Sequence, residues 1–204
     1  INQESLSDLI LAGRIFFDRL ESSNPIASRP YREEHFMSSV NPVVTHPEDI
    51  KTAVRDYYRE SAEKGSCCST GPSCGCGSCA SDVIVDSASY TKQSGYLAEA
   101  DLGLGCGIPT KHAKIQAGET VLDLGSGAGN DAFIAASLVG PKGKVIGVDM
   151  TPDMLSKARR IARDRSISNV EFRLGEIEAL PIADGIVDLA LSNCVINLVP
   201  DKSK

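Results

Sequence analysis

The fold of this chain is decided by residues 120–150, which read TVLDLGSGAGNDAFIAASLVGPKGKVIGVDM. The first apolar run, 121–124, has the length and composition of a buried strand. A glycine-rich loop follows, then an apolar helical run over 132–138, a turn, and a second apolar run that ends at Asp149. Strand, glycine loop, helix and strand in this order form one βαβ unit, and we expect a ligand site where the first strand ends.

The glycine loop and the acid after the second strand predict the kind of ligand. Glycines let the backbone turn sharply and approach a ligand closely, and Asp149 can accept hydrogen bonds from two vicinal ribose hydroxyls. The dinucleotide fingerprint G-x-G-x-x-G has a glycine where this chain has Asn130. The run G-S-G-A-G, preceded by Asp123, resembles instead the first motif of class I S-adenosylmethionine (SAM) methyltransferases. A dinucleotide site and a glycine-rich turn that binds nothing remain the alternatives.

The composition is that of a globular protein, with 42% hydrophobic and 24% charged residues among 204. The net charge is −6 and no basic run is interleaved with aromatic residues, so nucleic acid is not an expected partner. No apolar stretch has the length of a membrane span and no signal-peptide pattern is present, which predicts a cytoplasmic protein without membrane contact. Because the chain begins at Ile1 and stops at Lys204 in a polar stretch, we expect a fragment.

Five of the seven cysteines lie between residues 67 and 79, in the stretch GSCCSTGPSCGCGSCA. An odd number of cysteines without a secretion signal argues against a disulfide framework and for thiol or metal chemistry. Thiolates select soft ions, so this glycine-rich loop is a candidate site for a soft metal or metalloid. Adventitious zinc binding, or a loop without a function, is the alternative.

Three units are expected along the chain. Residues 1–46 contain an amphipathic helical pattern over 5–20 and a proline-rich linker, whose role the sequence does not indicate. Residues 47–110 contain a helix that ends near residue 64, the cysteine-rich loop, and a cap over the ligand site; Tyr57 and Tyr58 of the helix are expected in the core or in a lid. Residues 111–204 form the SAM-binding domain, with further strands at 170–174 and 186–191 and a helix that follows Thr151 as its N-cap.

Four strand ends carry the candidate site residues. In open α/β sheets ligands bind outside the carboxyl ends of the strands, so these four ends should share one edge of the sheet. Glu176 with Ile177 is the candidate for the adenine edge, with a solvated surface carboxylate as the alternative. Cys194 is expected near the transferred methyl group, with a small buried core cysteine as the alternative. The four ends are at Gly125, Asp149, Glu176 and Asn193–Cys194.

Five segments, LGCGIPT, TVLDLGSGAGND, VIGVDMTPDML, FRLGEIEALP and SNCVINLVPDK, resemble in sequence and order the bacterial-type arsenite methyltransferases. The resemblance runs from about residue 57 to residue 204. It implies an α/β fold, the class I SAM-methyltransferase (Rossmann-like) doubly wound sheet, incomplete in this chain. It also implies an enzyme of metalloid detoxification that transfers the methyl group of SAM to thiolate-bound trivalent arsenic. By the same resemblance SAM is held by Asp123, Gly125, Ser126, Gly127, Gly129, Asp149, Met150, Glu176, Ile177 and Asn193.

The resemblance further implies three catalytic cysteines. Cys194 is an arsenic ligand, and Cys67 or Cys68 is the upstream thiol that completes arsenic binding, for which we name Cys68, or that reduces the oxidised product. An external thiol reductant such as thioredoxin or glutathione is the implied partner. The family uses another cysteine downstream of the SNCVINL stretch and has seven strands, whereas four strands are predicted here.

The chemistry is consistent with these residue types. Trivalent arsenic is a soft thiophile with a lone pair that attacks the sulfonium methyl in line, so positioning is the main catalytic device and no general base is needed. Two alternatives remain open: a SAM-dependent methyltransferase of another small molecule, and a soft-metal or metalloid-binding protein whose SAM fold is not catalytic. An acceptor hydroxyl normally needs a base, and no histidine lies near the strand ends in the sequence.

Overall fold

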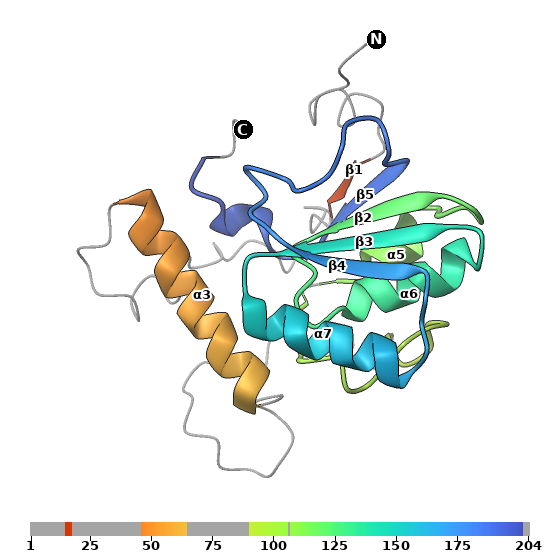
Figure 1. Ribbon diagram of the computed structural model, residues 1–204, viewed down its shortest axis with the longest axis horizontal. Helices are drawn as coiled ribbons and strands as arrows, with labels where there is room; N and C mark the ends of the chain where they lie inside the picture. The colour runs from red at the N-terminus through yellow and green to blue at the C-terminus, as the bar shows by residue number, and fades with distance from the viewer. Residues whose placement is uncertain (1–14, 18–45, 65–89, 106, 202–204) are drawn as a thin grey trace, which may run out of the picture.

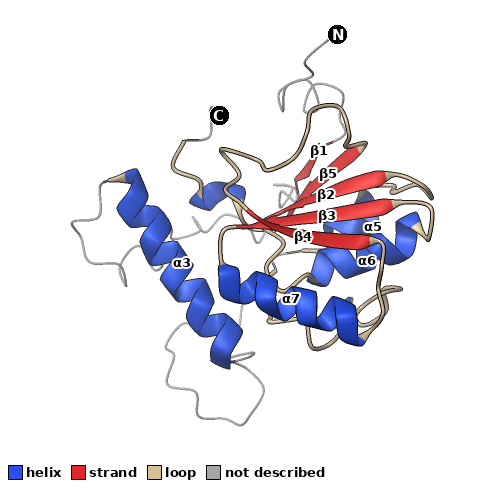
Figure 2. Cartoon of the chain, in the orientation of Figure 1, coloured by secondary structure: helices blue, strands red, loops and turns tan. Residues whose placement is uncertain are grey.

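The computed structural model describes residues 15–17, 46–64, 90–105 and 107–201. In this part of the chain all strands join one parallel sheet in the order β1-β5-β2-β3-β4 (Figure 2). The strands are β1 (Ile15–Phe17), β2 (Thr120–Leu124), β3 (Lys144–Asp149), β4 (Val170–Leu174) and β5 (Leu189–Ser192). The helices are α3 (Pro47–Lys64), α5 (Pro109–His112), α6 (Asn130–Val139), α7 (Pro152–Asp164) and the 3₁₀ turn η1 (Ile196–Leu198).

The central strands are mostly apolar, as expected where both faces of a sheet are covered. Val121 of β2 packs on the face that α6 and α7 cover, and Figure 1 shows these helices together on one side of the sheet. Leu122 and Leu124 point to the other face, where the irregular segment 177–187 supplies Ile177, Leu180, Ile182 and Val187. Because successive side chains of a strand point to opposite faces, the core forms two layers, one on each side of the sheet.

The strand order reverses at β2, and this reversal fixes where a ligand can bind. From β2 the chain proceeds through α6 to β3 and through α7 to β4 on one side, whereas β5 returns to the opposite side of β2. Such a switch point opens a crevice outside the carboxyl ends of the two strands that flank it. The four strands predicted from the sequence are all present. The last begins at Leu189 rather than at residue 186, because its pairing with β2 begins at Val121 opposite Leu189.

The helix predicted over residues 5–20 is wrong at residues 15–17, which form β1. The rest of that prediction lies outside the described residues. Ile15, Phe16 and Phe17 pair in parallel with residues 190–192 along the edge of β5. Isoleucine and phenylalanine favour strands. Pairing with the backbone N–H and C=O groups at the edge of β5 favours a strand here over the helix that the local spacing of apolar residues predicts.

The helices follow the prediction with small differences. α3 ends at Lys64 as expected, but Tyr57 is 52% exposed, so only Tyr58 fits the expectation of a core or lid residue. Thr151 holds the N-cap position of α7 but makes no side-chain capping hydrogen bond. Within the described ranges, no helix combines the length and apolar character that a membrane crossing requires.

Candidate active site

A cleft at the carboxyl ends of β2, β3, β4 and β5 brings the predicted strand ends together. It encloses about 1130 Å³ of empty space, part of which is open to solvent. Helix α3 and the segment 100–105 form the wall opposite the sheet. Gly125, Asp149, Glu176 and Cys194, one from each strand end, all line this one cleft. The prediction that the four ends share an edge is therefore confirmed.

The glycine loop after β2 shapes the floor of the cleft. Gly125 has φ +71°, and a Cβ at this position would overlap the side chain of Val195. Glycine is therefore required where the β2 end touches the β5 end. Gly127 also has a positive φ, of +52°, but a Cβ there would meet nothing within 4 Å. The backbone at Gly127 is thus free for close approach by a ligand. Gly129, with φ +95°, caps α6 and faces the rings of Phe133 and Phe172.

Asp149 is positioned by the backbone of two neighbouring loops. Its Oδ2 accepts a hydrogen bond from the N–H of Gly127 at 2.9 Å, and its Oδ1 accepts one from the N–H of Thr151 at 2.8 Å. Burial raises the pKa of Asp149, and these two N–H groups oppose the rise. Each carboxylate oxygen has further lone pairs, so the side chain can also accept hydrogen bonds from a ligand.

Three carboxyl groups make this part of the cleft acidic. Asp123 is 3% exposed and Asp131 is 8% exposed, and both line the cleft with Asp149. Burial, followed by repulsion from Asp131 and Asp149, raises the pKa of Asp123 well above its usual range. The Oδ2 atom of Asp123 has no hydrogen-bond partner among the described residues. A buried carboxyl oxygen without a donor favours a ligand that carries a positive charge.

The Asp123→Asn change is expected to stabilise the ligand-free protein. The amide keeps the shape of the carboxyl group and cannot ionise. The pKa of Asp123 is higher in the folded than in the unfolded chain. The free energy of unfolding therefore contains the full contribution of the neutral Asp123 carboxyl below about pH 4, and this contribution is lost as the pH rises through the raised pKa. The melting temperature of the variant should therefore exceed that of the wild type more at pH 8 than at pH 5, by roughly 2–4 °C for each kcal/mol gained.

Thermal melts at both pH values test this expectation. Asp184→Asn is the matched control, since Asp184 is exposed and lies outside the cleft. A melting temperature of Asp123→Asn at or below the wild-type value at pH 8 contradicts the account of Asp123.

Asn193 joins three segments of the cleft wall. Its Nδ2 group, with two N–H donors, lies within hydrogen-bond distance of three acceptors: Asp131 Oδ2 at 2.9 Å, Gly107 O at 3.0 Å and Tyr90 Oη at 2.9 Å. The Tyr90 hydroxyl is within hydrogen-bond distance of both Gly107 O and the Asp131 carboxylate. Burial, and then the charge of Asp131, raises the pKa of Tyr90. Asn193 thus fixes the β5 end against α6 and the segment before α5, while it also lines the cleft.

Cys194 is the second residue after β5 and lines the cleft, with a backbone φ of +56°. A cysteine in the left-handed region is uncommon, and such residues concentrate at functional sites. Cys194 is disulfide-bonded in this structure. Neither upstream candidate, Cys67 or Cys68, is described by the structure. The other cysteines outside the described residues are Cys74, Cys76, Cys79 and Cys106.

The loop after β4 presents two carboxylates to the cleft. Glu176 and Ile177, the predicted adenine-edge pair, both line it, as does Met150. Glu178 lines it as well and was missed, although the repeated acid in G-E-I-E could have indicated it. Lys51 and Tyr90 were also missed, since each reaches the site through contacts between segments far apart in the sequence. Asp131 was missed too, although it ends the segment TVLDLGSGAGND that carries the glycine loop.

The residues of the glycine loop suit a polar ligand such as SAM. Three buried polar atoms of the cleft, Asp123 Oδ2, Ser126 Oγ and Asn130 Oδ1, have no hydrogen-bond partner among the described residues. Buried polar groups are nearly always satisfied, so three of them on one wall indicate a partner that supplies donors and acceptors.

Comparison with known proteins agrees with this arrangement. A family model described as a methyltransferase domain matches residues 115–204. An arsenite methyltransferase from Halobacterium salinarum is 49% identical over 169 residues, which cover 78% of this chain and 43% of the relative. The chain is a homologue of the arsenite methyltransferases. An arsenite methyltransferase from Aquipseudomonas alcaligenes is 47% identical over 105 residues, covering 48% of this chain and 30% of the relative.

This homologue spans less than half the length of either relative. Among solved structures, an arsenic(III) SAM methyltransferase from Chlamydomonas reinhardtii matches with 39% identity and a TM-score of 0.41, over 60% of this chain and 39% of that one. The matched methyltransferase domain and the strand order identify the fold as the class I, Rossmann-like SAM-methyltransferase fold in partial form. The prediction of the fold class is confirmed.

Proposed function

We propose that this protein transfers the methyl group of SAM to trivalent arsenic, as a cytoplasmic enzyme of metalloid detoxification. The observation that carries the proposal is the meeting of Cys194 with the glycine loop and Asp149 in one cleft. A thiol that can bind a soft atom and a site built for a nucleoside thereby share one space. The names of the two relatives support the same substrate.

The acidic character of the cleft favours SAM over a dinucleotide. SAM carries an ammonium and a sulfonium, both positive, whereas the pyrophosphate of a dinucleotide is an anion. Asp123 and Asp131, buried beside the glycine loop, attract the positive groups of SAM and repel the pyrophosphate of a dinucleotide. Asn130, where a dinucleotide fingerprint has its last glycine, supports the same choice.

Each segment of the cleft has a proposed part in holding SAM. Asp149 accepts the ribose hydroxyls, Met150 and Ile177 lie against the adenine, and Glu176 faces its amino group. The glycine loop keeps side chains away from the bound molecule, and Asp123 accepts a hydrogen bond from the ammonium. SAM supplies an electrophilic methyl group on a sulfonium. The proposed set is Asp123, Gly125, Ser126, Gly127, Gly129, Asp149, Met150, Glu176, Ile177 and Asn193.

Cys194 is the proposed arsenic ligand on the acceptor side. As a thiolate it forms an As–S bond, and its position at the β5 end directs the arsenic lone pair toward the methyl group. The lone pair forms the new As–C bond while the electrons of the S–CH₃ bond return to the donor sulfur. Arsenic is oxidised to the pentavalent state, and no proton needs to be removed, so the chain contributes mainly position. Cys68 is the proposed second ligand, with Cys67 as its alternative.

An external thiol reductant is part of the proposal. A cysteine in a disulfide has no thiolate to offer arsenic, and Cys194 is disulfide-bonded in this structure. Two electrons and two protons from a dithiol, such as reduced thioredoxin, or from two molecules of glutathione, convert that disulfide to thiols. Two thiols also return methylated pentavalent arsenic to the trivalent state as they form a disulfide.

The test is incubation of the protein with SAM, arsenite and a thiol reductant, followed by separation of arsenic species. We expect methylated arsenic that carries the label of methyl-labelled SAM, and none when the reductant is omitted. SAM binding without arsenic methylation would contradict the proposal and favour a different small-molecule acceptor. Arsenite binding without SAM binding would favour a metalloid-binding protein.

A further inference from the structure

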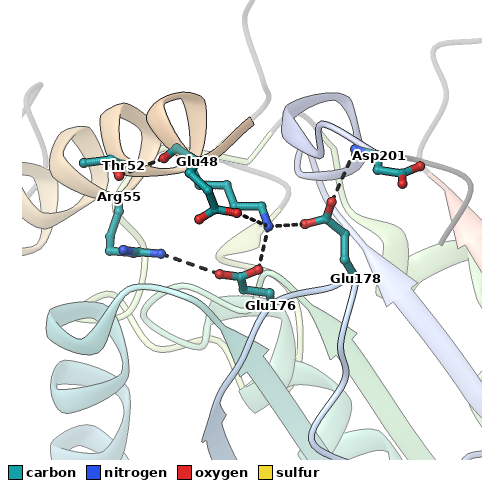
Figure 3. Close-up of polar contacts among 7 residues, drawn as sticks. Glu48, Thr52, Arg55, Glu176, Glu178 and Asp201 are labelled. Carbon is teal, nitrogen blue, oxygen red and sulfur yellow. Dashed lines mark hydrogen bonds and ion pairs between the residues drawn. The ribbon is translucent and has the colours of Figure 1, made fainter. Parts of the chain in front are cut away.

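One lysine of α3 binds two carboxylates of the loop that follows β4. Lys51 Nζ lies 2.6 Å from Glu176 Oε2 and 2.7 Å from Glu178 Oε2. Figure 3 labels the two glutamates. The Lys51 side chain is 11% exposed and that of Glu178 is 10% exposed. Residues 51 and 176 are 125 positions apart in the chain, so this contact joins α3 to a distant part of the sheet domain.

Neighbouring groups extend the contact into a small network. Arg55 Nη2 lies 3.7 Å from Glu176 Oε1, and Glu48 Oε1 lies 3.5 Å from Lys51 Nζ. The N–H of Asp201 donates to Glu178 Oε1 at 3.3 Å. Three segments therefore meet at Glu178: the loop after β4, helix α3 through Lys51, and the chain that follows η1 through Asp201 (Figure 3).

The network lies on the wall of the cleft itself. Lys51, Glu176 and Glu178 all line it, and Val54 and Tyr58 of α3 line it beside them. Isolated surface ion pairs contribute little, but Lys51 is largely shielded from solvent and serves two acids at once. Without its ammonium, these two carboxylates, two residues apart, would repel each other on the wall of the cleft. Lys51 is thus the cation that the two carboxylates share, and it links the loop after β4 to helix α3.

We propose that Lys51 is a positioning residue that prepares the nucleoside end of the cleft for the cofactor. It acts through Glu176 and Glu178 and keeps Val54 and Tyr58 of α3 against the bound nucleoside. The inference rests on the proposed function, because it takes the ligand to be SAM. Its effect belongs to binding, since Lys51 contacts the loop after β4 and not the β5 end with Cys194.

The Lys51→Met change tests the inference by calorimetry with SAM and with S-adenosylhomocysteine. We expect roughly tenfold weaker binding of both ligands, because the loop after β4 and helix α3 are no longer held in their positions. The KM for SAM should rise by the same factor while kcat stays near the wild-type value. Lys51→Arg should recover most of the affinity, because it keeps the charge.

Arg59→Met is the matched control. Arg59 lies on the same helix and pairs only with Asp56 among the ion pairs of the described residues, at 3.2 Å, with both side chains about half exposed. It lies outside the cleft, and its variant should bind SAM as the wild type does. Failure of the wild type to bind SAM would overturn the proposed function. If the wild type binds SAM and Lys51→Met binds it with the same affinity, the role of Lys51 is overturned and the proposed function stands. The same holds if Lys51→Met lowers kcat alone.

Discussion

Replacing Cys194 with serine is expected to abolish arsenite methylation while SAM still binds. Serine keeps the size of the side chain but offers no thiolate, and a hydroxyl binds soft arsenic poorly. The arsenic lone pair then loses its fixed direction at the β5 end, and loss of such positioning costs roughly 100-fold or more in rate. Cys194 lies on the cleft wall beside the β2 end, so the change removes a ligand of the arsenic acceptor and leaves the proposed nucleoside contacts in place.

Methylation is measured under reducing conditions by arsenic speciation, and SAM affinity by calorimetry on the same preparation. The melting temperature of Cys194→Ser must be compared under reducing conditions too, since the wild-type cysteine is disulfide-bonded in this structure. Turnover equal to the wild type would remove Cys194 from the reaction. Loss of SAM binding together with turnover would show that the residue supports the cofactor site instead.

The Asp149→Ala change is expected to weaken SAM binding by roughly 10- to 100-fold. Hydrogen bonds to a charged group contribute about 1.5–3 kcal/mol net, and each 1.4 kcal/mol is a factor of ten in affinity. The change also frees the N–H groups of Gly127 and Thr151, which Asp149 now holds at 2.9 and 2.8 Å. The glycine loop should therefore lose order in addition to the ribose contact.

Calorimetric titration with SAM measures this effect. The matched control is Asp153→Ala, because Asp153 is an exposed acid in the first turn of α7 and lies outside the cleft. The control should bind SAM within about twofold of the wild type, because a surface substitution away from a site changes little. An Asp149→Ala affinity equal to that of the control would contradict the ribose assignment.

The sequence predicts the βαβ unit well because its signals are local. The apolar run of β2, the glycines after it and the acid that ends β3 all fall within residues 120–150, and parallel pairing brings their ends together. The position of Cys194 also follows from topology alone, since a parallel β5 must end at the same edge.

Contacts between distant segments have no such local signal. Nothing near Lys51 in the sequence indicates that it meets Glu176 and Glu178, and nothing near Tyr90 indicates that it meets Asn193. These pairs depend on how α3 and the segment before α5 pack on the sheet domain. The edge strand β1 is missed for the same reason, because its partner β5 lies far along the chain.

The most direct test is location of arsenic by anomalous X-ray diffraction, in crystals of the reduced protein with S-adenosylhomocysteine and arsenite. Arsenic bonded to Cys194 Sγ, on the side that faces the donor sulfur above the ends of β2 and β5, is the predicted result. Arsenic bound to other thiols, away from the nucleoside and with Cys194 unligated, would contradict the account.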